Sequence, residues 1–190
     1  MRHPFLVGAR IYLRPVEPAD VTDAYVDWLN DPGVTRFLQT GVTPTTKTAV
    51  RAYVKRAVQA PDTVMLAIVE RGTDRHVGNV KLGPIHRIHR RADLGVMIGD
   101  KTRWGRGYGK EALSLALGYA FNRLNLRKVT LGVDAGHRSA VRLYRQLGFK
   151  VEGVQRQHWF RDGQYRDNVL MGLLCSDYPA ARGSVRHGGG

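Results

Sequence analysis

Trp104-Gly105-Arg106-Gly107-Tyr108-Gly109-Lys110 has a glycine at every second position. It stands between an apolar, strand-like segment and a long segment with helical periodicity. Glycines have no Cβ, so the backbone N–H groups of this loop can approach a ligand closely, and a helix N-terminus adds partial positive charge. The combination is typical of a phosphate or pyrophosphate site, to which Arg103, Arg106 and Lys110 add formal charge. A plain tight turn is the alternative interpretation of the glycines alone.

Two common phosphate-binding motifs do not describe this loop. A P-loop aligned on Gly109-Lys110 would need its first glycine at Trp104 and its hydroxyl at Glu111. A dinucleotide-binding fingerprint that starts at Gly105 would need its third glycine at Lys110. Both alignments fail, so the loop is neither of these motifs.

The segments on both sides of the loop alternate between strand and helix periodicity. Apolar runs or alternation predict strands over 10–15, 63–69, 76–82, 92–98 and 128–133. They also predict a final hairpin of 149–159 and 165–174 around the turn Arg161-Asp162-Gly163-Gln164. Helical spacing predicts a helix from Pro18 to Leu29 that stops at Asn30-Asp31-Pro32-Gly33, and a second helix that Thr45-Thr46 can cap and Pro61-Asp62 ends. It also predicts helices over 107–124 and over 139–147, the last of which ends at Gly148. The predicted order is βααβββαβαββ, a mixed α/β arrangement in one domain.

Composition narrows the class of protein. The 190 residues carry 30 Lys+Arg against 16 Asp+Glu, a net charge of +14, which favours an anionic partner such as nucleic acid, an anionic membrane or a phosphorylated small molecule. The single Cys175 excludes an internal disulfide and a cysteine-based zinc site. No apolar run approaches the roughly 20 residues that span a bilayer, so we expect a soluble, cytoplasmic protein without a membrane partner.

The glycine loop and a second block resemble the GCN5-related N-acetyltransferase (GNAT) family, in particular its RimJ/RimL branch. The family motif Arg/Gln-x-x-Gly-x-Gly/Ala opens the central helix, and here Trp104 stands in its first position. The second block, from Val133 to Phe149, has His137 where the family usually has Asn. The resemblance covers about residues 8–175, which we expect to form the N-acetyltransferase domain, and we expect 176–190 to be a flexible tail. It implies a mixed, mostly antiparallel sheet flanked by helices.

The resemblance also implies a cofactor and its contacts. Acetyl-CoA is the expected co-substrate, with no metal. Met97 and Ile98 would contact the pantetheine arm through their backbones, and His137 would either bond the cofactor near its thioester or only begin a helix. The pyrophosphate would lie on the glycine loop, formed by Arg103, Trp104, Gly105, Arg106, Gly107, Tyr108, Gly109 and Lys110.

Direct attack of a primary amine on the thioester is the implied reaction. Tyr144 matches the family tyrosine that can protonate the leaving thiolate, although it could instead only pack against Phe149. Asp93 is the candidate base, directly or through a water chain, and its alternative is an ion pair with Arg90 or Arg91.

The acceptor is the least constrained part of the prediction. An amino sugar or a nucleotide-linked amino sugar is favoured, a ribosomal-protein N-terminus is the alternative, and a polyamine is less favoured because a +14 surface repels a polycation. A non-enzymatic module that binds CoA or RNA is the alternative of a different function class. For an enzyme, we expect contact with nucleic acid only through association with the ribosome. The last hairpin could pair with that of a second copy, which would give a homodimer. The candidate acceptor-binding residues are Trp28, Asn30, Phe37, Gln39, Trp159 and Phe160. Trp28 and Phe37 could instead be core residues.

Overall fold

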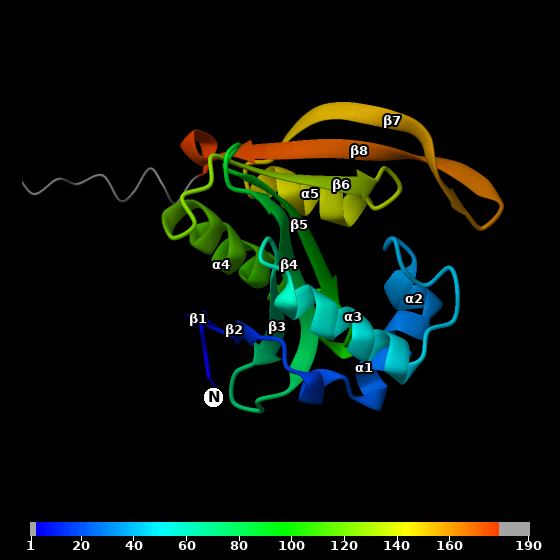
Figure 1. Cartoon of the computed structure of the whole chain (residues 1–190). Coiled ribbons are helices and arrows are strands. Elements are labelled where there is room, and N and C mark those ends of the chain that lie inside the picture. Colours follow the sequence, from blue (N-terminus) through cyan, green and yellow to red (C-terminus); the bar gives the residue numbers. More distant parts are fainter. Residues whose placement is uncertain (1–2, 179–190) are drawn as a thin grey trace, which may run out of the picture. The chain divides into compact units, whose positions relative to one another are not determined.

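The computed structural model describes residues 3–178, and most of the predicted tail at 176–190 lies outside the described residues (Figure 1). The chain divides into two compact units. The first contains the residues up to Ile85 together with Leu94–Ala116, and the second contains His86–Asp93 and the residues from Leu117 onward.

The strands of the first unit follow one another in hydrogen-bonded order. Two short strands, β1 (Leu6–Val7) and β2 (Ile11–Pro15), are followed by β3 (Val64–Glu70), β4 (His76–His86) and β5 (Arg91–Ile98), in the order β1-β2-β3-β4-β5. The pairs β1–β2, β2–β3 and β3–β4 are antiparallel. The near-continuous apolar run of β3 is buried along almost its whole length, as its composition predicts.

Short polar side chains cap the N-termini of the helices in the first unit. Thr22 accepts a hydrogen bond from Tyr25 N at the start of α1 (Asp23–Asn30), and Thr46 caps α3 (Lys47–Gln59) in the same way. The helix α1 ends at Asn30, within the predicted stop Asn30-Asp31-Pro32-Gly33. The unexpected feature follows it: Asp31 accepts a hydrogen bond from Gly33 N, and Pro32 begins a further short helix, α2 (Pro32–Thr35).

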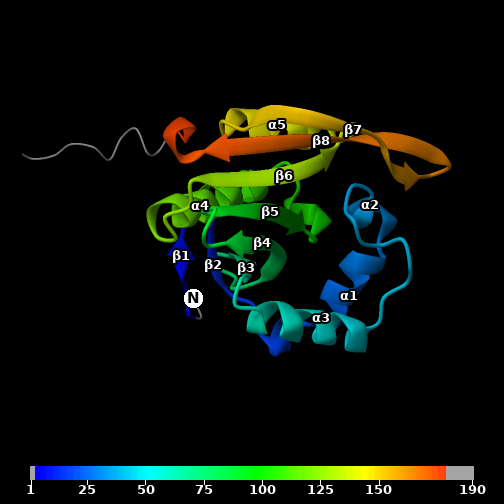
Figure 2. The same ribbon diagram turned by 45° about the horizontal axis from the view of Figure 1, so that its top comes forward.

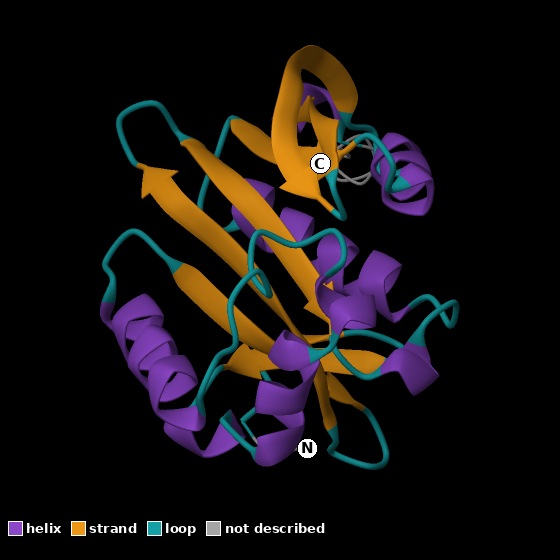
Figure 3. Cartoon of the chain, turned by 90° about the vertical axis from the view of Figure 1, so that its right-hand side faces the viewer, coloured by secondary structure: helices purple, strands orange, loops and turns teal. Residues whose placement is uncertain are grey.

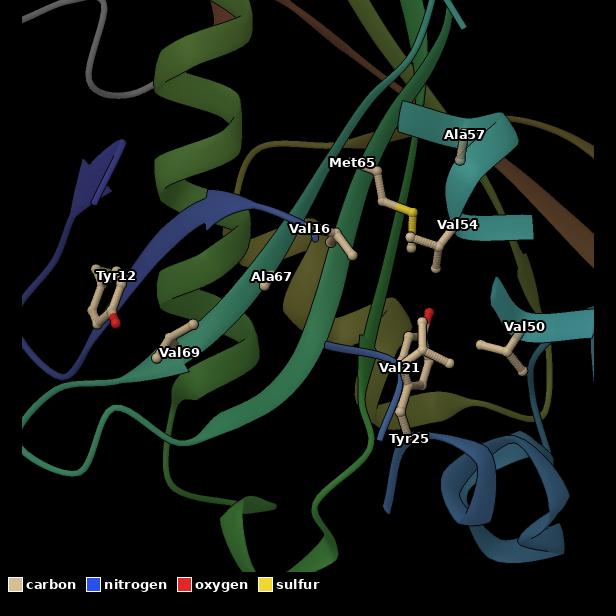
Figure 4. Close-up of a cluster of buried hydrophobic side chains, with 10 residues drawn as sticks. All are labelled: Tyr12, Val16, Val21, Tyr25, Val50, Val54, Ala57, Met65, Ala67 and Val69. Carbon is tan, nitrogen blue, oxygen red and sulfur yellow. The ribbon is translucent and has the colours of Figure 1, made fainter. Parts of the chain in front are cut away.

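A buried cluster joins these helices to the sheet of the first unit. Figure 4 shows Val50, Val54 and Ala57 of α3 and Tyr25 of α1 in one group with Met65 of β3. Leu29 and Met97 pack against the cluster and are only partly buried, so one margin of this core is open to solvent. That margin becomes a pocket, described below.

The second unit contains the remaining strands and helix. The first residues of β5 pair in parallel with β6 (Lys128–Asp134), which pairs antiparallel with β8 (Gln164–Leu174), which in turn pairs with β7 (Lys150–Arg161). Both views show β6, β8 and β7 side by side (Figures 1 and 2). The helix α5 (Arg138–Gln146) lies in this unit, and α4 (Tyr108–Asn122) runs from the first unit into it.

The last two strands form a long, curved hairpin (Figures 1 and 3). Its turn is the predicted one: Arg161 pairs with Gln164, and Asp162 and Gly163 both have positive φ, at 48° and 75°. Two consecutive residues with positive φ are typical of a type I′ turn, which matches the twist of the two strands. The ladder has two register shifts along β7, and most residues of β7 are exposed.

The predicted fold class is confirmed. The eight strands follow the order β1-β2-β3-β4-β5-β6-β8-β7, in which β5–β6 is the parallel pair among the pairings given above. Two elements were not predicted, β1 with two residues and α2 with four. Both are too short to carry a periodic pattern, and the first predicted helix is in fact the 3-10 turn Pro18–Asp20 followed by α1.

Candidate active site

The glycine loop has the backbone conformation of an anion site. Gly105 and Gly107 have positive φ values of 71° and 83°, which side chains other than glycine rarely adopt. Helix α4 begins immediately after the loop, at Tyr108, so its first N–H groups have no carbonyl within the helix to bond. A Cβ at Gly105 would meet no atom within 4 Å, so a ligand can approach the backbone there. The loop therefore fits the pyrophosphate of a nucleotide cofactor.

The side chains of the loop have different tasks. Trp104 is 46% exposed, and its Nε1 donates a hydrogen bond of 2.8 Å to the carbonyl of Ile98 at the end of β5. Arg106 and Lys110 are exposed, whereas the Arg103 guanidinium forms an ion pair with Glu70 at 3.0 Å. Arg106 and Lys110 are thus the cations of this group that face solvent, and Arg103 is held inside the unit.

Glu70, a residue that the sequence interpretation missed, anchors the loop from the end of β3. Tyr108 Oη donates a hydrogen bond of 2.5 Å to one of its carboxylate oxygens, and Thr73 and Arg103 donate to the other. These hydrogen bonds, that of Tyr108 first, lower the pKa of Glu70 to about 2. The signal in the sequence was a carboxylate at the end of a buried apolar run, where a charge needs partners.

A pocket of about 530 Å³ lies in the same unit, at the open margin of the core. It is bordered by α1, α3 and strands β3, β4 and β5, and by the segment after α2. Its apolar lining includes Leu29, Leu38, Val50, Met65, Val96 and Met97. Its polar lining comprises the hydroxyl and amide residues Tyr25, Gln39, Thr40, Thr45, Tyr53 and Asn79, and Lys81. Of the predicted residues, the pocket brings together Gln39 and Met97.

The other predicted acceptor residues of the first unit lie elsewhere. Trp28 packs against Tyr25 and His76, with ring centroids 5.7 and 5.3 Å away, and its indole covers Gly99. Asn30 accepts from and donates to the backbone of Thr45, so it ties α1 to the segment before α3. Phe37 lies after α2 beneath the Arg36 guanidinium. These three positions shape the surroundings of the pocket rather than its lining.

Trp159 and Phe160 belong to β7 of the second unit. The Arg161 guanidinium lies 5.5 Å from the Trp159 ring, and the same side chain approaches the buried Asp134 at 3.5 Å. Phe160 is 62% exposed and packs on Tyr165 across the hairpin. The predicted role of Trp159 and Phe160 in acceptor binding stays a prediction.

Tyr144 is held by the end of its own helix. Gly148 donates to the carbonyl of Arg145, and Phe149 donates to that of Tyr144, which together form a Schellman motif with the glycine at its left-handed position. The motif places the Phe149 ring against Tyr144, with 5.7 Å between centroids. Burial raises the pKa of Tyr144 to about 12, so the phenol keeps its proton at neutral pH. The Tyr144 ring therefore packs on Phe149, and its role as the acid stays a prediction.

His137 and Asp93 also lie in the second unit. His137 is the residue before α5, its Nδ1 lies 3.2 Å from Ser139 Oγ, and burial lowers its pKa. Asp93 is exposed on β5 and accepts a short hydrogen bond from Thr130 on β6. Arg90, one of its expected ion-pair partners, instead bonds the carbonyl and side chain of Asn125. Asp93 is therefore fixed by a neutral hydroxyl, and its role as a base stays a prediction.

Among the described residues, no cluster of three or more His, Cys, Asp or Glu side chains could hold a metal ion. Within the same part of the chain, no helix is long and apolar enough to cross a membrane.

Comparison with known proteins agrees with this geometry. The model of the acetyltransferase (GNAT) domain family matches residues 10–150. A spermidine N(1)-acetyltransferase of Escherichia coli strain K12 is 39% identical over 103 residues, which cover 54% of this chain but only 55% of that enzyme. The [ribosomal protein uS5]-alanine N-acetyltransferase of the same strain is 31% identical over 104 residues, covering 55% of this chain and 51% of the enzyme.

A solved structure extends the likeness to the whole fold. The Vibrio cholerae spermidine N-acetyltransferase in complex with CoA and spermine superposes with a TM-score of 0.82 at 24% identity, covering 90% of this chain and 99% of that one. At this identity it shows the fold alone. The glycine loop, the strand and helix order and the family match converge on one conclusion: the chain belongs to the GNAT acetyltransferase family, whose members use acetyl-CoA, as the resemblance implied.

Proposed function

We propose that the chain transfers the acetyl group of acetyl-CoA to the primary amine of a small molecule, with an amino sugar or a nucleotide-linked amino sugar as the favoured acceptor. The observation that carries the proposal is the pocket of about 530 Å³ beside Met97, whose polar lining consists mostly of hydroxyl and amide groups. Such groups suit an acceptor rich in hydroxyls, and the volume suits a small molecule.

In this proposal the glycine loop and β5 hold the cofactor. The N-terminus of α4 with Arg106 and Lys110 binds the pyrophosphate, and the backbone of Met97 and Ile98 lies along the pantetheine arm. Acetyl-CoA supplies the acetyl thioester. A backbone N–H near the end of β5 donates a hydrogen bond where negative charge develops on the carbonyl oxygen. Holding both reactants removes much of the entropic part of the barrier.

The family resemblance assigns the proton transfers of the reaction to Asp93 and Tyr144. The amine must lose a proton before it attacks, and Asp93 accepts that proton directly or through water. Tyr144 donates its proton to the leaving sulfur, because its phenol is fixed and protonated at neutral pH. His137 would hydrogen-bond the cofactor near its thioester.

A polyamine is the second candidate acceptor, favoured by the 39% identity to the spermidine enzyme. It conflicts with the charge of the pocket, because the described lining residues include Lys81 and no Asp or Glu that could bind a second ammonium group. An N-terminal alanine is the acceptor named for a more distant relative. The structure contributes no observation that favours it.

Release of the CoA thiol, measured with a thiol reagent, tests the proposal. The screen uses amino sugars, nucleotide-linked amino sugars, spermidine, amino acids and peptides with N-terminal alanine, each against acetyl-CoA alone as background. We expect saturable release with an amino sugar. The proposed function fails if every amine leaves the rate at background, and a strong response to spermidine alone would transfer the assignment to the polyamine class.

A further inference from the structure

The wall of the pocket formed by β4 carries two adjacent recognition groups, Asn79 and Lys81. They are two residues apart on the strand, so their side chains project to the same face of the sheet. Their partners across the ladder on β3 are Ala67 and Met65, and Met65 also lines the pocket. Neither residue was singled out by the sequence, because only the strand register places them beside α1 and α3.

Asn79 is buried with half of its amide engaged. It is only 6% exposed, and its Oδ1 lies 3.1 Å from His76 Nε2, which also bonds the carbonyl of Gly78 at 2.9 Å. The Asn79 Nδ2 is fully buried and has no hydrogen-bond partner within the described chain. A buried N–H donor without an acceptor is destabilising, so a ligand atom that accepts this hydrogen bond would bind more tightly.

Lys81 supplies the charge beside this amide. It is half-buried, and it is the charged residue among the described residues that line the pocket. Three carboxylates of the same unit are held by other cations: Asp20 pairs with Arg14, Asp31 with Lys101 and Glu70 with Arg103. A cation next to an unpaired N–H donor attracts an anion, because phosphate and carboxylate oxygens accept from both groups.

We propose that the acceptor carries an anionic group, a phosphate or a carboxylate, that binds between the Asn79 amide and the Lys81 ammonium. This rests on the proposed function and narrows its substrate class. The same pair disfavours a polyamine, whose second ammonium would meet Lys81 in place of an anion. Specificity then comes partly from the attraction of Lys81 for an anionic acceptor and partly from its repulsion of a polyamine's second ammonium group.

Matched acceptors test the anion site. Glucosamine, glucosamine 6-phosphate and 2-amino-2-deoxyglucuronate share the ring and the amine and differ in the group at C6, and spermidine represents the polycation. We expect kcat/KM, measured by thiol release, to be at least about tenfold higher for an anionic acceptor than for glucosamine, a difference of about 1.4 kcal/mol. The phosphate and carboxylate arms show which anion fits.

Variants then connect the preference to the two residues. Lys81→Met keeps the length of the side chain and removes its charge, so the ratio between anionic and neutral acceptors should fall about tenfold. Asn79→Asp keeps an oxygen toward His76 and replaces the N–H donor, so it should lower the same ratio. Lys55→Met makes the same charge change on the exposed face of α3, outside the pocket, and should leave the ratio unchanged.

Calorimetric binding of glucosamine 6-phosphate separates this inference from the proposed function. Binding that weakens about tenfold in Lys81→Met, without thiol release from any amine, supports the anion site and overturns the acetyl transfer. The opposite result is thiol release with the same ratio of kcat/KM between anionic and neutral acceptors in the wild type, Lys81→Met and Asn79→Asp. If circular dichroism shows that both variants are folded, this result overturns the anion site and leaves the proposed acetyl transfer intact. Equal kcat/KM values of the wild type for glucosamine and glucosamine 6-phosphate would also overturn the anion site.

Discussion

Replacing Glu70 by Gln should loosen the anchor of the glycine loop. The substitution keeps the size of the side chain and an oxygen that can accept from Tyr108, but it removes the negative charge that pairs with Arg103. The Glu70 side chain is only 11% exposed, so solvent screens the pair weakly. The hydrogen bonds that lower the pKa of Glu70 are therefore the interactions that the variant weakens.

The magnitude follows from the pKa. The pKa of Glu70 falls from 4.5 to about 2, and each tenfold change in proton affinity corresponds to ~1.4 kcal/mol, so the ionised carboxylate contributes at most about 3.5 kcal/mol to folding at neutral pH. Because Gln keeps a hydrogen bond, we expect Glu70→Gln to lower the free energy of unfolding by about 2 kcal/mol. We also expect the KM for acetyl-CoA to rise, since the loop loses its anchor.

The pH dependence is the sharper measurement. A folded-state pKa below the unfolded value means that the stabilisation is complete above pH 4.5 and is lost as pH falls toward about 2. Urea unfolding at pH 7 and at pH 3.5 should therefore show the difference between wild type and Glu70→Gln shrinking by about 1 kcal/mol at the lower pH. Glu152→Gln, which removes an exposed partner of Lys128, is the matched control and should cost less than about 1 kcal/mol. A difference that stays constant from pH 7 to pH 3.5 would refute the charge-based account of the anchor.

Four further substitutions address other parts of the chain. Tyr144→Phe should lower kcat about 10²-fold with little change in the KM for acetyl-CoA, and an unchanged kcat excludes the phenol as the acid. Asp93→Asn should remove the acidic limb of the pH–rate profile, and a wild-type profile would exclude Asp93 as the base. Asp20→Asn should lower the free energy of unfolding by about 3–5 kcal/mol in urea titrations, because it leaves the nearly buried Arg14 guanidinium without its charge partner; a loss below 1 kcal/mol contradicts this. Gly78→Ala should lower the melting temperature, because a Cβ there would lie 2.1 Å from the Met97 carbonyl oxygen, and a melting temperature equal to the wild type's would show that β5 yields freely.

Local sequence patterns predicted most of the fold. The apolar run of β3, the caps Thr46 and Gly148 and the turn at Asp162-Gly163 are features that a few adjacent residues decide, and each lies where it was expected. β1 and α2 were missed because two and four residues cannot show a period.

The site was harder to predict, because tertiary contacts decide it. The backbone of Gly105 and Gly107 has the conformation that the loop motif implied, but Arg103 was expected to face the cofactor and instead pairs with Glu70. Asn79 and Lys81 carry no motif, and their importance follows from strand register and from the unpaired amide. The net charge of +14 and the pocket have the same sign, but only the structure shows that the pocket's charge comes from Lys81.

The outer strands of the sheet bear on how the protein behaves at high concentration. β1 offers only two residues to an incoming strand, and β7 is bent by two register shifts, so neither presents a long, straight row of free N–H and C=O groups. The exposed Val151 and Val154 of β7 would otherwise make that edge attractive to another chain. A second copy that paired there would first have to flatten the hairpin. The shortness of β1 and the register shifts of β7 should therefore protect the protein against aggregation by strand pairing. Deletion of a bulged residue, which would straighten β7, should make the protein less soluble.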